Sequence, residues 1–176
     1  MSVARSAATA GGTVEPGQLG LPADLLRWVS ERAGAVDRNA ADPFDVVAAL
    51  AERGQLDRCV SAPDAIHASA AAIRELARVC MSSAFVTWSH RMTIEYLRHG
   101  AHETFREDVL PSLLTGRRPG STALASAFRD AAGMAELPVV AHQVDGGLRL
   151  EGHIPWASNL RDDAVMVLGV RGADGE

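Results

Sequence analysis

The spacing of apolar residues changes once along the 176-residue chain, and this change constrains the fold more than any other feature. Over 21–116, apolar side chains recur at steps of three and four residues, as in amphipathic helices. Over 137–170 they alternate with polar residues or form short apolar runs, as in strands. Gly116, Pro119 and Gly120 favour a linker between the two regions. We therefore predict an α+β fold in which an all-helical domain precedes a β-domain.

Capping residues divide the helical region into separate helices. Asp24 favours the start of a first helix, and Gly54 stands where a second helix, over 44–53, should end. Ser61 favours the start of a long helical stretch with an apolar stripe. The stripe consists of Ile66, Ala70, Ile73, Ala77, Cys80, Ala84, Trp88 and Met92.

This stretch would exceed the usual length of a globular helix if it were unbroken. We expect a break at Ser82-Ser83, because serine side chains compete with the hydrogen bonds of a helix interior. Gly100 should end the resulting pair. A last helix over 102–114 contains Pro111, which should bend the helix or end its regular part early.

The β-region predicts a hairpin and a third strand. Strands over 137–144 and 148–154 flank a tight turn at Asp145-Gly146-Gly147. Leucines alternate with charged residues along the second strand, so we expect one of its faces to be buried. The third strand, over 164–170, is more fully apolar. Three strands alone leave edges and an apolar face uncovered, so the β-domain reads as incomplete.

Composition argues against several classes of protein. The 17 basic residues, all arginine, against 22 acidic residues give a net charge of −5, which is unlike a dedicated nucleic-acid-binding protein. Cys59 and Cys80 are too few for a disulfide framework, and Cys80 fits a core position. No apolar run is long enough for a membrane span or a signal peptide. We expect a cytoplasmic protein with a flexible tail over 1–20 and no membrane partner.

Histidines and arginines suggest two candidate sites, but neither sequence pattern is specific to one kind of site. His90, His99 and His102 lack the spacing of metal ligands on one helical face, so we expect no metal and interpret them as solvated or capping residues. Arg117-Arg118 follows a helix end, where the pair either complements the helix dipole or holds a phosphate. General phosphate-loop, zinc-protease, nucleophile-elbow and dinucleotide motifs do not occur.

An ordered set of segments covers 22–175 and carries a more specific signal. Leu-Pro-x-Leu-x-x-Gly stands at 110–116 and precedes the linker. Downstream, the hairpin leads from Gly147-Leu148-Arg149-Leu150-Glu151-Gly152 to Trp156-Ala157-Ser158-Asn159. This set resembles the acyl-CoA dehydrogenase family, whose helical domain ends in yLPxLxxG and whose β-domain carries GYxLNGxKxWITNA.

The resemblance implies a domain organisation. After the tail, 21–118 would form the family's N-terminal helical domain, and 119–176 would form the start of its antiparallel middle β-domain. Family enzymes are roughly twice as long, and their C-terminal helical domain carries the catalytic carboxylate in most members. The resemblance therefore implies a fragment or split subunit, and it assigns no catalytic base to this chain.

The resemblance also implies FAD as cofactor. Trp156 matches the tryptophan beside the flavin, Ser158 matches the hydroxyl residue near its N5 atom, and Ala157 lies between them. The family's second flavin segment, LTEPxxGSD, is represented by 124–130. There Leu124 is retained, alanine replaces the threonine, and Ser126 offers a hydroxyl one position later. The missing Gly-Ser-Asp departs from the pattern for CoA recognition.

The function implied is an oxidoreductase that removes two hydrogens from an acyl-CoA or a related thioester in fatty acid metabolism. An electron-transfer flavoprotein would accept the electrons, and a homo-oligomer or a complementing subunit would complete the site. We expect this chain alone to be inactive and to bind FAD weakly. Two alternatives remain: a flavin-dependent monooxygenase of the same fold, and a non-catalytic helical interaction module.

Overall fold

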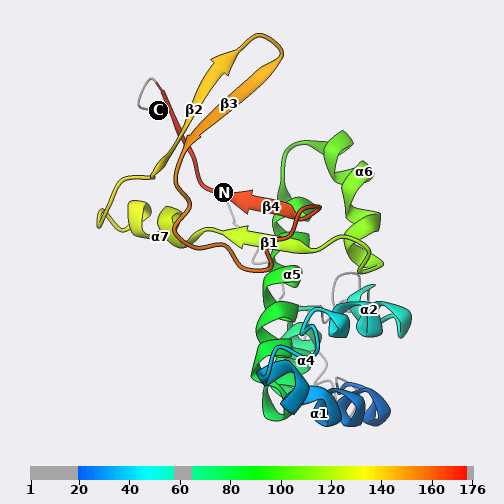
Figure 1. Cartoon of the computed structure of the whole chain (residues 1–176). Coiled ribbons are helices and arrows are strands. Elements are labelled where there is room, and N and C mark those ends of the chain that lie inside the picture. Colours follow the sequence, from blue (N-terminus) through cyan, green and yellow to red (C-terminus); the bar gives the residue numbers. More distant parts are fainter. Residues whose placement is uncertain (1–19, 58–64, 174–176) are drawn as a thin grey trace, which may run out of the picture.

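The computed structural model describes residues 20–57 and 65–173, in which helices come first and strands follow (Figure 1). This order confirms the α+β prediction. The helices are α1 (Ala23–Asp37), α2 (Asp45–Glu52), α4 (Ala65–Val79), α5 (Met81–His99), α6 (Glu103–Leu114) and α7 (Ala125–Ala131). The strands are β1 (Gly120–Ala123), β2 (Val139–Val144), β3 (Gly147–Gly152), β4 (Val165–Leu168) and β5 (Arg171–Gly172).

Helix α5 is the centre of the molecule, since α1, α2, α4, α6, β1 and β4 all pack against it. One apolar core fills the space between α1, α2, α4 and α5. Its fully buried large side chains are Leu25, Val46, Val47, Leu50, Leu56 and Leu76. Burying a side chain of this size contributes about 1.5–3 kcal/mol. A smaller cluster of Ile94, Val109, Leu113 and Val165 joins α5 to α6 and β4.

The boundaries between helices agree with the sequence at most points. Gly54, with φ +65°, follows α2, and α5 ends before Gly100 as predicted. The break expected at Ser82-Ser83 is wrong by two residues. It falls at Cys80, whose backbone is extended, and Ser83 lies inside α5 with its hydroxyl 3.3 Å from the Cys80 sulfur. The predicted start at Ser61 lies outside the described residues.

Two details of the helical prediction need correction. Pro111 does not end α6 early, because the Thr115 N–H still bonds to the Pro111 carbonyl and the helix runs to Leu114. The apolar stripe is buried only around its middle, at Cys80 and Ala84. Ile66 is 80% exposed, and the part of α5 that carries Trp88 is also open to solvent.

The strands form two small sheets. In the first, β1 pairs with β4 in parallel; in the second, the order is β3-β2-β5. The predicted hairpin is confirmed as antiparallel β2–β3, but β2 and β5 run parallel. The expectation of an antiparallel β-domain is therefore correct for the hairpin only. Strand β1 begins at Gly120, the last residue of the predicted linker.

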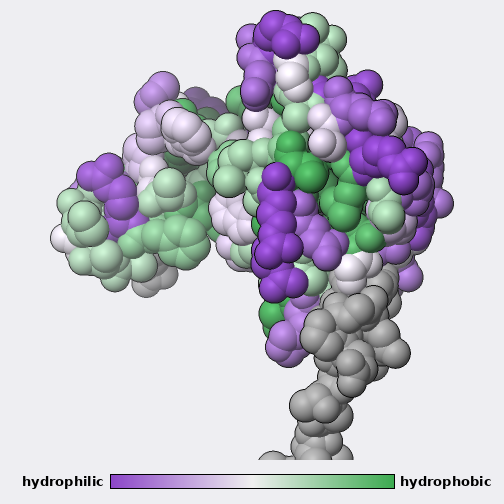
Figure 2. Space-filling view, turned by 90° about the horizontal axis from the view of Figure 1, so that it is seen from below, coloured by the Kyte–Doolittle hydropathy of each residue, from purple (hydrophilic) through white to green (hydrophobic). Residues whose placement is uncertain are grey.

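Strand β3 is exposed along its whole length, so the expectation of a half-buried strand is wrong. Figure 1 shows the β2–β3 hairpin extending away from the helices. Figure 2 shows the lobe that contains α7 projecting from the helical body, with pale and green residues predominating on the visible face. None of the helices within the described ranges is both long and apolar enough to cross a membrane.

Candidate functional site

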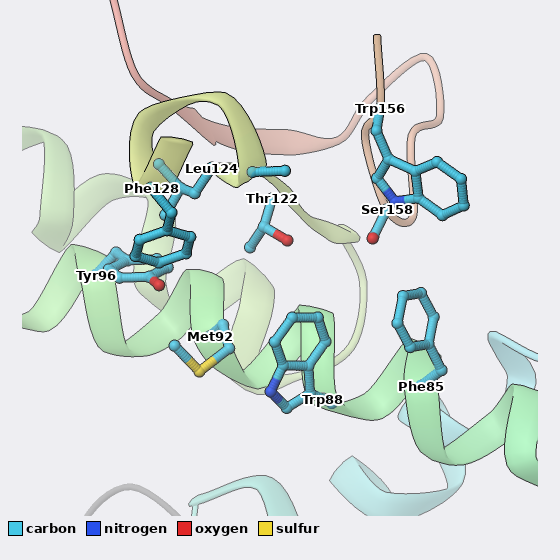
Figure 3. Close-up of a pocket in the computed structure, with 10 residues that line it drawn as sticks. Phe85, Trp88, Met92, Tyr96, Thr122, Leu124, Phe128, Trp156 and Ser158 are labelled. Atoms are coloured by element: carbon cyan, nitrogen blue, oxygen red, sulfur yellow. The ribbon is translucent and has the colours of Figure 1, made fainter. Parts of the chain in front are cut away.

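A cleft of about 420 Å³ opens between one face of α5, the region from β1 to α7, and the loop that follows β3 (Figure 3). Ten residues line it: Phe85, Trp88, Met92, Tyr96, Thr122, Leu124, Ala125, Phe128, Trp156 and Ser158. Its volume lies in the usual range for small-molecule sites. Five of the chain's eight aromatic residues are among these ten, so aromatic surface is concentrated here.

The floor of the cleft is one face of α5. Phe85, Trp88, Met92 and Tyr96 recur at steps of three and four residues, so they lie in one row along the helix. The rings of Phe85 and Trp88 are 5.5 Å apart, and both side chains are about half exposed. The sequence placed Trp88 and Met92 on an apolar stripe, but not Phe85 and Tyr96. It could not indicate that the row lines an opening and is not part of the core.

The roof has two aromatic side chains from different segments. Figure 3 shows Phe128 of α7 above Tyr96, and Trp156 of the loop after β3 above Phe85. Trp156 is 65% exposed and Phe128 is 66% exposed. Trp156 therefore borders a cleft beside the hairpin and is not enclosed in a core.

Besides the Tyr96 phenol, two aliphatic hydroxyl groups, those of Thr122 and Ser158, provide polar lining. The Ser158 N–H donates to the Thr122 carbonyl at 3.1 Å, which holds the loop against β1. The Thr122 hydroxyl lies 3.3 Å from the Ser89 hydroxyl. Figure 3 shows the side-chain oxygens of Thr122 and Ser158 facing each other across the space above Trp88. No carboxylate, arginine or histidine is among the lining residues, so these residues supply no strong acid or base.

Asn159 fixes the loop that carries Trp156 and Ser158. Its side-chain amide donates to the Val86 carbonyl at 2.8 Å and to the Gly120 carbonyl at 3.1 Å, so it joins the loop to both α5 and β1. Its φ of +57° is a left-handed value that asparagine tolerates better than most residues. The sequence placed Asn159 in the family-like segment but gave it no role.

His90 lies in the interior beside the cleft, contrary to its interpretation as a solvated or capping residue. It is fully buried. The Gly120 N–H donates to Nδ1 at 2.9 Å, and Nε2 lies 3.0 Å from the Leu113 carbonyl. Since Nδ1 accepts a hydrogen bond, Nε2 carries the proton and donates to Leu113. Burial, with a smaller contribution from the Arg91 charge, lowers the pKa of His90 from 6.5 to about 4.

An ion pair joins the cleft loop to the N-terminal helices. Arg161 bonds to both carboxylate oxygens of Asp42 at 2.6 Å, and its guanidinium lies 5.1 Å from the centre of the Phe44 ring. Burial alone would raise the pKa of Asp42. Hydrogen bonds from the Phe44 N–H and from Arg161 outweigh this effect, and the pKa is lowered.

The five residues predicted to hold a cofactor are only partly brought together. Leu124, Trp156 and Ser158 line the cleft. Ser126 instead lines a separate, smaller depression with Arg129 and other residues, and Ala157 lines neither. The roles of all five stay predictions. Phe85, Tyr96 and Thr122 also line the cleft. The sequence provided no reason to single them out as site residues.

Two of the other candidate residues, Arg118 and His99, have partners within the protein. Arg118 donates from Nε to the Asp163 carbonyl at 2.9 Å and so ties the segment before β1 to the one before β4. His99 lies 3.7 Å from Glu95 and is largely exposed. Within the described ranges, no group of three or more histidine, cysteine or acidic residues is arranged to hold a metal ion.

The chain has a fold similar to that of an acyl-CoA dehydrogenase of known structure. The comparison that supports this class is with the structure of a Tcur3481-Tcur3483 steroid acyl-CoA dehydrogenase variant. The TM-score is 0.53 and the identity 17%, over 91% of this chain and 45% of that one. The chain thus spans less than half of this neighbour. No family model and no curated protein matches the sequence.

Proposed function

We propose that this chain holds the flavin ring in an FAD-dependent oxidoreductase of acyl-CoA dehydrogenase type. The observation that carries the proposal is the cleft on α5, with its five aromatic side chains and its border at Trp156. A slot with aromatic residues on floor and roof suits a planar heteroaromatic ring, and it excludes water from both ring faces.

The residues of the cleft fit the ring portion of FAD. Trp156 would cover one side of the ring, and the hydroxyl of Ser158 would donate to a ring nitrogen. Thr122 offers a second hydroxyl on β1. Bound FAD would supply a hydride acceptor. The cleft offers no arginine for the pyrophosphate, so we assign only the ring to this chain.

The absence of charged groups from the cleft lining supports a shared active site. Removal of an α-proton from an acyl thioester needs a base, and none of the lining residues is one. We propose that a complementing polypeptide, or a second copy of this chain, supplies the base and the remaining FAD contacts. The name of the structural neighbour pairs two polypeptides, which is compatible with this arrangement.

Flavin titration tests this proposal. FAD fluorescence and calorimetry should detect weak, saturable binding to the wild-type chain. Trp156→Ala should weaken this binding by about fivefold, since stacking on one aromatic contributes around 1 kcal/mol. Phe105→Ala is the matched control, because Phe105 is exposed to a similar degree on α6 but lies outside the cleft.

An equal loss of FAD affinity in the two variants would show that FAD does not bind in the cleft. Tight stoichiometric FAD binding by the chain alone would contradict the shared site.

The second candidate is a non-catalytic interaction module, which the uncharged lining also favours. Saturable binding of a partner protein, lost in Trp156→Ala while FAD fails to bind at any concentration, would favour that module.

A further inference from the structure

Strand β3 is one of the two edge strands of its sheet, and the longer one. Among the described residues it pairs with β2 on one side only, since the strand order is β3-β2-β5. All six of its residues are exposed, including Leu148 at 61% and Leu150 at 49%. Such an edge presents a row of backbone donors and acceptors to another strand.

The hairpin register determines which backbone groups point outward. Val144 pairs with Gly147 across a two-residue turn, so this pair must be hydrogen-bonded. Bonded and non-bonded pairs alternate along an antiparallel ladder, so Arg149 and Glu151 also bond to β2. The N–H and C=O groups of Leu148, Leu150 and Gly152 therefore point away from β2, toward the open edge.

We propose that β3 pairs antiparallel with β3 of a second copy of this chain, about a twofold axis at Leu150. In this register each Leu150 lies opposite Leu150 of the other copy, and Leu148 lies opposite Gly152. All the outward-pointing backbone groups then meet partners. Arg149 of each copy lies opposite Glu151 of the other, so two cross-strand ion pairs form.

The charges select this register over its neighbours. Residues whose backbone groups point toward the open edge must lie opposite one another in the dimer. The twofold axis must therefore pass through a residue of β3 and cannot pass between two residues. An axis at Arg149 places two arginines opposite each other, and an axis at Glu151 places two glutamates opposite each other. Like charges directly across a strand pair are destabilising. Only the axis at Leu150 combines opposite charges with the longest overlap of β3.

The pairing would join two three-stranded sheets into one continuous sheet. Leu148 and Leu150 of both copies would lie on one face, while Arg149 and Glu151 lie on the other. The interface is isologous, so each contact occurs twice. A contact made by single strands is small, which places the dimer among weak, concentration-dependent complexes.

A charge-swap series tests the register by sedimentation velocity over about 1–500 μM, a range suited to small interfaces. The wild-type chain should dimerise with rising concentration. Arg149→Glu should weaken the dimer by about tenfold, because both ion pairs become like-charge pairs. Adding Glu151→Arg to Arg149→Glu restores opposite charges and should restore dimerisation. Arg117→Glu, an exposed reversal elsewhere, is the control.

Cysteine crosslinking gives a second measurement, because a disulfide traps even a weak dimer covalently. The twofold axis places Leu150 opposite itself at a Cα separation of about 5.5 Å, within disulfide range. Leu150→Cys should therefore crosslink between copies, whereas Leu148→Cys should not exceed the wild-type background. A wild-type monomer throughout the concentration range, a double variant no better than Arg149→Glu, or equal crosslinking at both positions would each overturn the proposal.

Discussion

At the scale of single residues, His90 joins three elements through one imidazole ring. The ring belongs to α5, accepts a hydrogen bond from the first residue of β1 and donates one to the carbonyl of Leu113 in α6. Phe44 packs against it edge-on, with ring centres 5.7 Å apart. Only the neutral imidazole can accept from Gly120 and donate to Leu113 together, so protonation removes one of the two bonds.

Stability should therefore depend on the protonation of His90. Its pKa is lowered from 6.5 to about 4 in the folded protein, so the unfolded chain binds more protons between these values. The free energy of unfolding should be fully maintained above pH 6.5 and should fall by on the order of 3 kcal/mol as the pH drops toward 4. Urea unfolding across this range measures the loss.

His90→Gln should flatten this pH dependence, because glutamine does not titrate. His99→Gln is the control on the same helix, since the His99 side chain is 81% exposed and lies beside Glu95 of the same helix. An unchanged slope in His90→Gln would assign the acid sensitivity to other groups.

At the scale of elements, the approach of β1 to α5 determines the depth of the cleft. A Cβ atom at Gly120 would lie 2.7 Å from the Thr93 Cβ and 2.9 Å from the His90 carbonyl oxygen. Thr93 also donates to the Ser121 carbonyl at 3.1 Å. The absence of a side chain at the first residue of β1 therefore brings Thr122 within reach of the cleft.

Gly120→Ala should destabilise the protein by about 1–3 kcal/mol, because the added methyl group overpacks this contact. Gly34→Ala should change the free energy of unfolding in the opposite direction. Gly34 lies inside α1, where its added Cβ would meet only the end of the Arg38 side chain at 3.4 Å. Alanine there should stabilise by up to about 1 kcal/mol. Thermal unfolding of both variants measures the difference, and equal effects would contradict the close approach of β1.

The elements differ in how far the sequence predicted them. Helices and the hairpin were predictable because periodicity and turn residues are local signals. Strand β1 was not, because Gly-Ser-Thr-Ala has no strand pattern and is ordered by its packing on α5. Alternation in β3 predicted two chemically different faces, but it carried no information about what covers them. The cleft combined a predicted residue, Trp156, with Tyr96 and Thr122, which only tertiary packing brings together.

At the scale of the whole molecule, few polar contacts connect the N-terminal helices to the segment after β3. The bond between Asp42 and Arg161 is the longest-range one in sequence, and both side chains are partly exposed. Its two-oxygen geometry and the Phe44 ring beneath the guanidinium distinguish it from an ordinary surface pair. This contact and the hydrogen bonds of Asn159 both attach the cleft loop to the rest of the protein.

Arg161→Ala should lower the free energy of unfolding by about 1 kcal/mol, near the upper end for exposed ion pairs. It should also increase hydrogen exchange in the loop over 153–164. Arg106→Ala is the control, because Arg106 pairs with Glu103 within α6 and connects no separate parts. That variant should lose less than about 0.5 kcal/mol. Unchanged exchange in the loop after Arg161→Ala would contradict a role for the pair in holding it.

The parallel pairing of β1 with β4 has a consequence for how the chain is made. Gly120 pairs with Val165, so residues 124–164, including α7 and the hairpin, must be synthesised before β1 finds its partner strand. The contacts among α1, α4 and α5 are complete well before that point. We expect the helices to fold on the ribosome first. During this time β1 lacks its partner strand, and the aromatic row on α5 is exposed because the residues on the other side of the cleft are not yet in place. A chaperone that binds exposed aromatic segments would meet this row during that interval.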